Sequence, residues 1–203
     1  MKKTLLLITA CILTVVSICH AQERTLVIDG LEMAVIGGPD GTVDFGAGNG
    51  SSVEVASASD NVAGGKLAIK VTYNAVNGGY MYIARGAGLD AKNAGWDISP
   101  DKIDWQKYRA IAFHMYGTDS KSQIAFDVKD SGGEIWRYTV ADDFKGWKQV
   151  ICPFDKFMPR SDWQPEIADK NSAMDFPLKS YQFEPLPESK GTLYFDMISL
   201  IEK

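Results

Sequence analysis

The sequence predicts an all-β fold, an antiparallel β-sandwich of the jelly-roll type, and two observations carry this prediction. Apolar and polar residues alternate with a period of two in several short segments, which is typical of strands buried on one face. Turn signals rich in glycine separate these segments, and no segment has the 3.6-residue period of a long helix. Short antiparallel strands joined by regular turns favour a sandwich or a jelly roll.

Four alternating segments are the clearest candidate strands. They cover residues 67–73, 111–116, 124–129 and 136–140. Turn signals follow or separate them at residues 77–79, 117–119, 130–133 and 145–146. Seven of the 19 glycines lie between Gly30 and Gly50, so we expect a loop there, over one end or edge of the sandwich. Residues 169–173 are expected to form one short helical turn.

The segment Gly46-Ala47-Gly48-Asn49-Gly50 resembles a phosphate-binding loop only superficially. A dinucleotide-binding loop needs a helix directly after it, whereas Ser51-Ser52-Val53 opens another strand pattern. We therefore interpret residues 46–50 as a flexible turn.

The amino terminus has the pattern of a secretory signal peptide over residues 1–21. Lys2 and Lys3 precede an apolar run that ends at Cys19, Ala21 offers a small residue at the cleavage point, and polar residues follow at once. The run is short for a bilayer span, and no second long apolar run follows. We therefore expect one domain over residues 22–203, without a membrane span, that is secreted, periplasmic or on the cell surface.

Composition excludes several classes of function. The chain has 21 Lys and Arg against 26 Asp and Glu, and this acidic balance argues against nucleic-acid binding. Without residues 1–21, one cysteine (Cys152) and one histidine (His114) remain. An internal disulfide and a zinc site rich in His or Cys are therefore excluded. Cys152 has apolar neighbours and is expected to be a small buried residue.

One loop has the composition of a sugar-binding site. Trp163 stands in the polar segment Arg160-Ser161-Asp162-Trp163-Gln164-Pro165, whereas Trp136 and Trp147 lie in strand patterns and are expected in the core. An aromatic ring covers the apolar face of a pyranose, and charged groups bind its hydroxyls. A loop tryptophan that caps the core is the competing interpretation.

Six segments, taken in chain order, carry a resemblance to a known family. They are Ile28-Asp29-Gly30-Leu31-Glu32, Gly133-Glu134-Ile135-Trp136, Asp143-Phe144-Lys145-Gly146-Trp147-Lys148, Cys152-Pro153-Phe154-Asp155-Lys156-Phe157, the segment 160–165, and Leu193-Tyr194-Phe195-Asp196-Met197-Ile198-Ser199-Leu200. This order resembles the family 11 carbohydrate-binding modules. The resemblance implies a jelly roll of the galactose-binding-like superfamily, which binds one β-glucan chain in a cleft on one sheet.

The resemblance implies contacts to carbohydrate at matching positions. The family's Arg-x-Asp-aromatic cluster falls on Arg160, Asp162 and Trp163, and its Gly-Tyr pair falls on Gly79 and Tyr80. In the family, aromatic rings stack on glucose, while Asp and Arg bind hydroxyls. His114 and Tyr116 lie on the polar face of the predicted strand 111–116. The full set of candidate carbohydrate-binding residues is Tyr80, His114, Tyr116, Arg160, Asp162 and Trp163.

The resemblance also implies a structural Ca²⁺ where the first and last strands meet. Glu32 and Asp196 match the side-chain ligands, and a backbone carbonyl near Lys66 would contribute. Ca²⁺ prefers several hard oxygen ligands, and weak sites suffice outside the cell. Since the family is attached to cellulases and mixed-linkage glucanases, the implied partners are a β-glucan polysaccharide and glycoside hydrolases of the same secretome.

Two alternatives to a non-catalytic polysaccharide-binding protein stay open. One is a small secreted glycanase, a cellulase or glucanase, whose acid pair is defined by a spatial separation that the sequence does not contain. The other is a structural or assembly protein that shares the fold without binding sugar, since one scaffold hosts many functions. The chain has no motif that pairs an acid with a nucleophile, which favours binding over catalysis.

Overall fold

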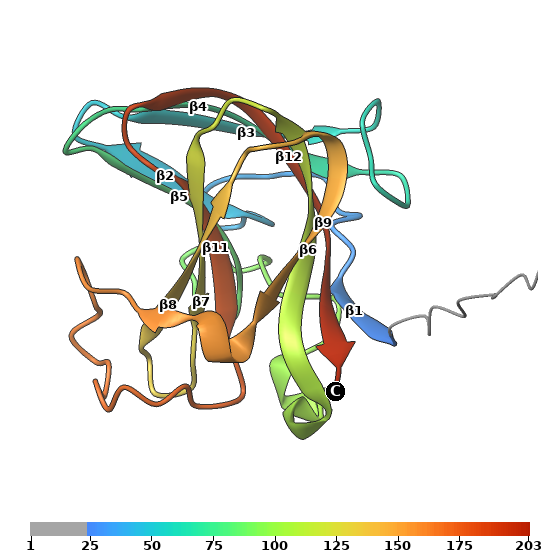
Figure 1. The fold of residues 1–203 in the computed structure, drawn as a ribbon, viewed down its shortest axis with the longest axis vertical. Helices are drawn as coiled ribbons and strands as arrows, with labels where there is room; N and C mark the ends of the chain where they lie inside the picture. Colours follow the sequence, from blue (N-terminus) through green and yellow to red (C-terminus); the bar gives the residue numbers. More distant parts are fainter. Residues whose placement is uncertain (1–23) are drawn as a thin grey trace, which may run out of the picture.

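The computed structural model describes residues 24–203, which form a sandwich of two antiparallel sheets (Figure 1). The strands are β1 (Thr25–Asp29), β2 (Asp44–Gly48), β3 (Ser52–Ala58), β4 (Ala68–Ala75), β5 (Tyr80–Gly86), β6 (Tyr108–Thr118), β7 (Gln123–Lys129), β8 (Ile135–Ala141), β9 (Lys145–Pro153), β10 (Met158–Pro159), β11 (Ser180–Pro185) and β12 (Ser189–Glu202). Three short 3₁₀ turns are η1 (Pro100–Lys102), η2 (Trp105–Lys107) and η3 (Phe154–Lys156). The predicted all-β sandwich is confirmed. The predicted signal peptide, residues 1–21, lies outside the described residues.

The two sheets are built from strands that are often distant in sequence. Sheet A has the order β3-β4-β12-β6-β9, with β1 also paired to β12. Sheet B has the order β10-β8-β7-β11-β5-β2. Figure 1 shows the two sheets side by side, with β1 next to the C-terminal end of β12. Because β11 lies between β7 and β5, side chains from three separate parts of the chain share the outer face of sheet B.

The core lies between the sheets and contains a cluster of phenylalanine rings. The Phe183 ring stacks on Phe195 at 3.8 Å between centroids, and Phe113 contacts Phe126 at 4.7 Å. These four side chains come from both sheets and are fully buried, so they join the layers. Cys152 is also fully buried, as expected, and burial raises the pKa of its thiol, so it acts as a small apolar residue.

A buried polar cluster ties β1 of sheet A to sheet B. Arg85 donates to both carboxylate oxygens of Asp29, with Nε 2.6 Å from Oδ2 and Nη2 3.0 Å from Oδ1. Tyr181 donates to the same carboxylate at 2.7 Å. All three side chains are at most 2% exposed, so each polar group needs these partners inside the protein.

Three detailed expectations are wrong. Residues 44–48 are strand β2, not part of a loop or flexible turn, because they pair along their whole length with β5. Residues 169–173 do not form a helical turn, because Lys170 and Ser172 have φ angles of +52° and +59°. Trp147 is half-buried on the outer face of sheet A and not in the core, while Trp136 is buried as expected.

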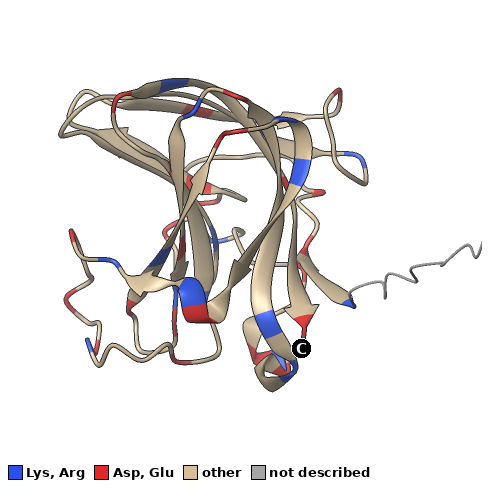
Figure 2. Cartoon of the chain, viewed as in Figure 1, with Lys and Arg blue, Asp and Glu red and all other residues tan. Residues whose placement is uncertain are grey.

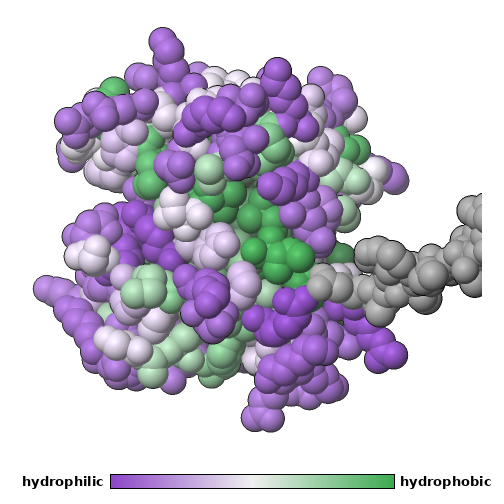
Figure 3. Space-filling view, in the orientation of Figure 1, coloured by the Kyte–Doolittle hydropathy of each residue, from purple (hydrophilic) through white to green (hydrophobic). Residues whose placement is uncertain are grey.

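The surface mixes charges of both signs. Figure 2 shows acidic and basic positions interspersed over strands and loops. In Figure 3, hydrophilic residues cover most of the visible face, and hydrophobic ones gather toward its middle. Within residues 24–203 no helix is long and apolar enough to cross a membrane.

Candidate functional site

A groove of about 580 Å³ crosses the face of sheet B that points away from the core. Strands β2, β5 and β11 line it together with the loop that follows β10. Two adjoining hollows of about 140 and 530 Å³ share lining residues with it: Trp163 and Gln182 in the first, and Arg160 and Asp162 in the second. The three hollows therefore form one extended depression across the sheet.

The strand register explains how the floor of this depression is built. Asp44, Ala84, Gln182, Asp127 and Arg137 pair in one continuous row across β2, β5, β11, β7 and β8. Neighbouring positions on these strands, such as Phe126 and Phe183, point into the core. Ala84, the second position of the row, has a short side chain, which leaves room for a ligand above it.

Aromatic side chains form the walls of the groove. Tyr80 is 51% exposed and Trp163 is 56% exposed, although both are large and apolar. Tyr82 lies two residues after Tyr80 on the same face of β5 and is half-buried. Burial, and then the negative charge of Asp44, raise the pKa of Tyr82, so its phenol stays neutral. Rings that belong to a core are buried, whereas exposed rings around a groove are typical of a ligand site.

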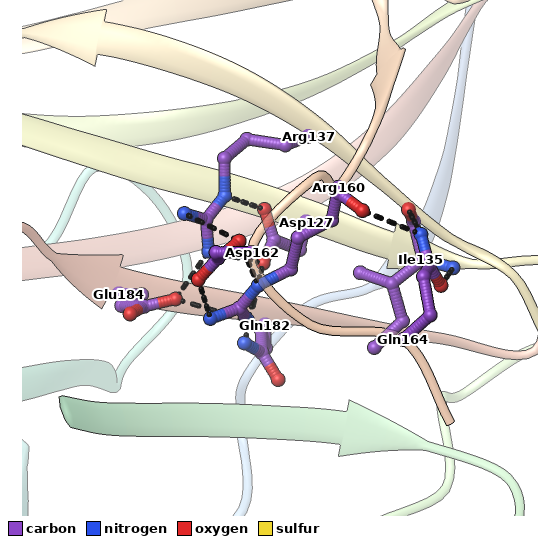
Figure 4. A network of polar contacts seen from close by, with 8 residues as sticks. All are labelled: Asp127, Ile135, Arg137, Arg160, Asp162, Gln164, Gln182 and Glu184. Carbon is purple, nitrogen blue, oxygen red and sulfur yellow. Dashed lines mark hydrogen bonds and ion pairs between the residues drawn. The ribbon is translucent and has the colours of Figure 1, made fainter. Parts of the chain in front are cut away.

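The groove that these rings line also contains part of a network of charged side chains. Figure 4 shows this network. Arg137 donates to both oxygens of Asp127 at 2.8 Å and also to Glu184. Arg160 Nη1 lies 3.2 Å from Asp127 Oδ2 and 3.2 Å from Glu184 Oε2. Gln182 adds a hydrogen bond to Asp127 at 3.3 Å. Asp127 and Glu184 are nearly inaccessible to solvent, so the two arginines compensate their burial.

Arg160 also holds Asp162 in place at the rim. Its Nε and Nη2 each donate to one oxygen of Asp162 at 2.9 Å, and its guanidinium carbon lies 5.9 Å from the centroid of the Trp163 ring. The hydrogen bond from Arg160 lowers the pKa of Asp162, while burial raises the pKa of Glu184. Asp162 is therefore an ionised, exposed acceptor with a fixed orientation.

The loop that carries Asp162 and Trp163 is fixed to β8. Ile135 N donates to Gln164 Oε1 at 2.8 Å, and Gln164 Nε2 donates to the carbonyl oxygens of Ile135 and Arg160 at 2.8 and 2.9 Å. Arg160 N donates to the Ile135 carbonyl as well. These bonds keep the loop in one conformation, which pre-organises the rim before a ligand arrives.

The structure brings four of the predicted residues together. Tyr80, Arg160, Asp162 and Trp163 all line the groove, although Tyr80 comes from a distant strand. His114 and Tyr116 do not join them, and this expectation is corrected: both lie on β6, in sheet A. The alternation of apolar and polar residues correctly predicted that both side chains lie on the polar face of their strand. It could not predict which sheet that strand joins.

Sequence reasoning missed a second set of groove residues. They are Asp44, Tyr82, Asp127, Arg137, Gln182 and Glu184. In the sequence, these residues could be recognised only by their position opposite the apolar face of each strand. Such positions identify groove residues only once β2, β5, β11, β7 and β8 are known to be neighbours.

The two carboxylates expected to bind calcium meet at one backbone segment. Ala63 N and Gly64 N donate to Asp196 Oδ2 at 2.8 and 3.1 Å, and Lys66 N donates to both oxygens of Glu32 at 3.0 Å. Asp196 is fully buried, and its burial, with a contribution from the charge of Glu32, raises its pKa. Within residues 24–203 neither carboxylate is ion-paired with Lys or Arg.

This donor set fits a hard divalent cation. Both carboxylates accept hydrogen bonds from residues 63–66 without a compensating positive side chain, a charge that Ca²⁺ would supply. Within the described chain no three His, Cys, Asp or Glu residues gather in a metal-type cluster, so backbone oxygens would have to complete the coordination. Leu31 and Met197, next to the two acids, have φ angles of +58° and +42°, so the backbone turns sharply at both.

Comparisons with known proteins agree with this geometry. The family model described as "Carbohydrate binding domain (family 11)" matches residues 27–203. Endoglucanase H of Acetivibrio thermocellus is 27% identical over 172 residues, which are 80% of this chain and 17% of that protein. Mannan endo-1,4-beta-mannosidase of Bifidobacterium adolescentis is 30% identical over 128 residues, 63% of this chain and 11% of that protein. The chain thus spans less than a fifth of the length of these curated relatives.

Among solved structures, the fold is similar to a family 11 carbohydrate-binding module from Clostridium thermocellum in complex with a β-1,3-1,4-mixed-linked tetrasaccharide. The TM-score is 0.67 at 22% identity, over 90% of this chain and 98% of that chain. This likeness shows the shared sandwich. Because the family model covers nearly all of the described residues, the chain belongs to the family 11 carbohydrate-binding domains.

Proposed function

We propose that this protein binds a polysaccharide of the β-glucan type in the groove on sheet B and does not cleave it. The observation that carries the proposal is the groove itself, where exposed aromatic rings stand beside a pre-formed network of arginines and carboxylates. The family membership and the mixed-linked glucan named for the similar module support the same ligand class.

The chemistry of a glucan chain suits each part of the groove. The rings of Tyr80 and Trp163 can cover the apolar C–H faces of pyranose units. Asp162 can accept hydrogen bonds from two neighbouring hydroxyls, and guanidinium N–H groups of Arg160 can donate to others. The length of the depression, which continues over β11, β7 and β8, favours a chain of several units over a single sugar.

The bonding of the groove acids favours binding over hydrolysis. A glycosidase needs one carboxylic acid to protonate the leaving oxygen and a second carboxylate free to act as base or nucleophile. Here Asp127 and Glu184 are each held by Arg137 and Arg160, and Asp162 is held by Arg160. Carboxylates fixed in this way are suited to orient hydroxyls.

Affinity electrophoresis tests the proposal directly. The purified protein is run through gels that contain mixed-linkage β-glucan, hydroxyethylcellulose or a soluble mannan, and reducing-sugar release is measured in parallel. We expect retardation by a β-glucan without release. Release that is lost when Asp127 or Glu184 is replaced supports a glycanase, and neither retardation nor release supports a structural protein. Retardation by mannan alone would assign the ligand class suggested by the name of the second relative.

We also propose a structural Ca²⁺ at Glu32 and Asp196. Chelation by EDTA is expected to lower the melting temperature of the wild-type protein, and excess Ca²⁺ is expected to restore it. A ligand at a hundredfold excess over its dissociation constant stabilises a fold by about 2.7 kcal/mol. Asp196→Ala should abolish the response, whereas Asp155→Ala, which removes an exposed acid elsewhere, should keep it. A wild-type melting curve that ignores the chelator contradicts the site.

We further propose that residues 1–21 direct export and that the protein acts beside glycoside hydrolases outside the cytoplasm. The pattern of the amino terminus and the names of the relatives, both of which are polysaccharide hydrolases, support this. Amino-terminal sequencing of the protein from its native host should begin at Gln22. A protein that retains Met1 in the soluble cell fraction contradicts export.

A further inference from the structure

The edge strand of sheet B has glycines at two of the three positions that face the groove side. In β2 (Asp44–Gly48), Phe45 and Ala47 pack against the core, while Asp44, Gly46 and Gly48 lie on the opposite face. Glycine is unfavourable inside a strand, because it loses more conformational freedom on folding and has no side chain to pack. Two alternate glycines on one face therefore require a reason.

Backbone geometry does not supply that reason. Neither Gly46 nor Gly48 has a positive φ, whereas Gly50, directly after the strand, has a φ of +88°. An alanine at position 46 or 48 would therefore meet no backbone strain, and what demands glycine must lie above the strand.

The register places a groove tyrosine opposite each of these glycines. Gly48 pairs with Tyr80, and Gly46 pairs with Tyr82. A methyl group at Gly48 would lie 2.5, 2.6 and 2.7 Å from Cε1, Cζ and Oη of Tyr80, far inside van der Waals contact. At Gly46 the corresponding distances to Tyr82 are 3.1, 3.2 and 3.1 Å.

These distances describe the orientation of the rings. A strand side chain usually stands roughly perpendicular to the sheet, which carries its far end away from the neighbouring strand. Here the far end of each tyrosine lies directly over the neighbouring glycine. The three atoms are almost equidistant from the methyl position, which is possible only when that position lies above the plane of the ring, over the Cε1–Oη edge of the phenol. Each ring therefore leans its phenol end over β2.

We propose that Gly46 and Gly48 are positioning residues that let the rings of Tyr82 and Tyr80 lean over β2 and form a two-ring stacking surface at this end of the groove. The inference rests on the proposed polysaccharide binding and extends it to residues that touch no sugar. The phenol end of each ring covers a glycine of β2, and Tyr80, which is half exposed, lines the groove where a ligand can reach it. Since the two tyrosines are about 7 Å apart along the strand, a sugar chain can contact both.

The two glycines differ in how much space lies above them for a methyl group. The space over Gly48 is smaller than a methyl group by a wide margin, so Gly48→Ala must lift the Tyr80 ring off the strand. At Gly46 the contact of 3.1 Å needs a shift of only a few tenths of an ångström. Gly48→Ala is therefore expected to weaken binding more than Gly46→Ala does.

Isothermal titration with a soluble mixed-linkage β-glucan tests this by a double-mutant cycle. Tyr80→Ala should weaken binding about tenfold, in the range of one lost aromatic contact. Gly48→Ala should cost a similar factor, and the double variant should bind no more weakly than Tyr80→Ala alone, because the glycine acts only through the ring. Gly191→Ala is the matched control. Gly191 also pairs with a tyrosine, Tyr73, but its methyl group would lie at an ordinary 3.8 Å.

Each outcome of the cycle has a separate meaning. Unchanged binding by Gly48→Ala, together with weakened binding by Tyr80→Ala, overturns the positioning role while leaving the groove intact. A double variant that multiplies both losses overturns it as well, because the glycine would then act independently of the ring. Normal binding by Tyr80→Ala contradicts the proposed sugar site and this inference with it. The melting temperature of Gly48→Ala should stay close to that of the wild type, since its backbone accepts alanine.

Discussion

The outer faces of the two sheets carry similar residues and arrange them in opposite ways. On sheet B, Tyr80 and Trp163 remain about half exposed beside a groove. On sheet A, Tyr116 packs edge-to-face against Trp147 at 5.6 Å and against Tyr194 at 5.8 Å between ring centroids. The same aromatic residue types thus form an open binding surface on one sheet and a packed cluster on the other.

The cause of the difference is what lies over each face. Asn61 accepts a hydrogen bond from the Trp147 indole at 2.9 Å, and Ala63 and Gly64 donate to Asp196, so residues 61–64 cover part of sheet A. Over sheet B, the loop that carries Trp163 is anchored to β8 by Gln164 and forms a rim of the groove. An aromatic ring can contact a ligand only where no other segment of the protein packs over it.

The buried carboxylates of the two sheets also differ, in the groups that bind them. Asp127 and Glu184 on sheet B are balanced by two arginines, and the resulting network keeps donors and acceptors at the groove. Asp196 on sheet A accepts only backbone N–H groups among the described residues. Arginines therefore balance the charge of Asp127 and Glu184, whereas no cationic side chain among the described residues pairs with Asp196, which is why we propose an ion there.

The largest expected effect comes from breaking the network of sheet B. Arg137→Met removes the donor that Asp127 and Glu184 share and leaves both buried with Arg160 alone. We expect a loss of about 3 kcal/mol in the free energy of unfolding, measured by urea denaturation, together with weaker glucan binding. Lys121→Ala, which breaks an exposed pair with Asp119, is the control and should leave the midpoint unchanged. Equal stability of the two variants would mean that the network is not needed for the fold.

Another buried carboxylate, Asp142, is held by hydrogen bonds from Thr118 and Ser120 and not by an arginine. Thr118 N and Oγ1 lie 2.9 Å from its carboxylate oxygens, and Ser120 Oγ lies 2.6 Å away. Burial alone would raise the pKa of Asp142, but the hydrogen bonds from Ser120 and Thr118 lower it below 3.8 overall. Asp142→Asn should therefore cost about 2 kcal/mol at pH 7.

The pH dependence of that cost has a definite sign. A carboxyl group whose pKa is lower in the folded state stabilises the fold above its unfolded pKa and loses this contribution as the pH falls through the folded value. The difference in unfolding free energy between wild type and Asp142→Asn should be constant above about pH 5 and shrink below 3.8. Urea denaturation of both proteins from pH 7 to pH 2 measures this difference. A difference that grows in acid would contradict a lowered pKa of Asp142 in the folded state.

The smallest effect tests the comparison of the rings directly. Trp163→Ala should weaken glucan binding about tenfold, or 1.4 kcal/mol, with little change in melting temperature, because the ring is exposed. Tyr116→Ala should do the reverse, lowering the melting temperature while leaving binding intact. Ile167→Ala, on the same loop as Trp163 and 80% exposed, is the matched control and should change neither. Weaker binding by Tyr116→Ala would show that sheet A also contacts the ligand.

Much of the fold could be predicted from the sequence because it depends on local patterns. Alternation predicted four strands that the structure contains as parts of β4, β6, β7 and β8, and a two-residue period fixes which side chains share a face. The cluster at Arg160, Asp162 and Trp163 was also visible, since the three residues are consecutive or nearly so. Alternation failed for residues 44–48, because glycine at positions 46 and 48 removed the pattern from strand β2.

What only the tertiary structure decided is which strands are neighbours. The row from Asp44 to Arg137 joins five strands whose order in sheet B differs from their order in the chain, and no local pattern contains that order. For the same reason His114 and Tyr116 were wrongly predicted to join the groove. The predicted face of their strand was correct, but the strand belongs to sheet A and not to sheet B. Local sequence determines the direction of each side chain from its own strand, whereas the contents of a groove depend on long-range pairings that the whole core selects.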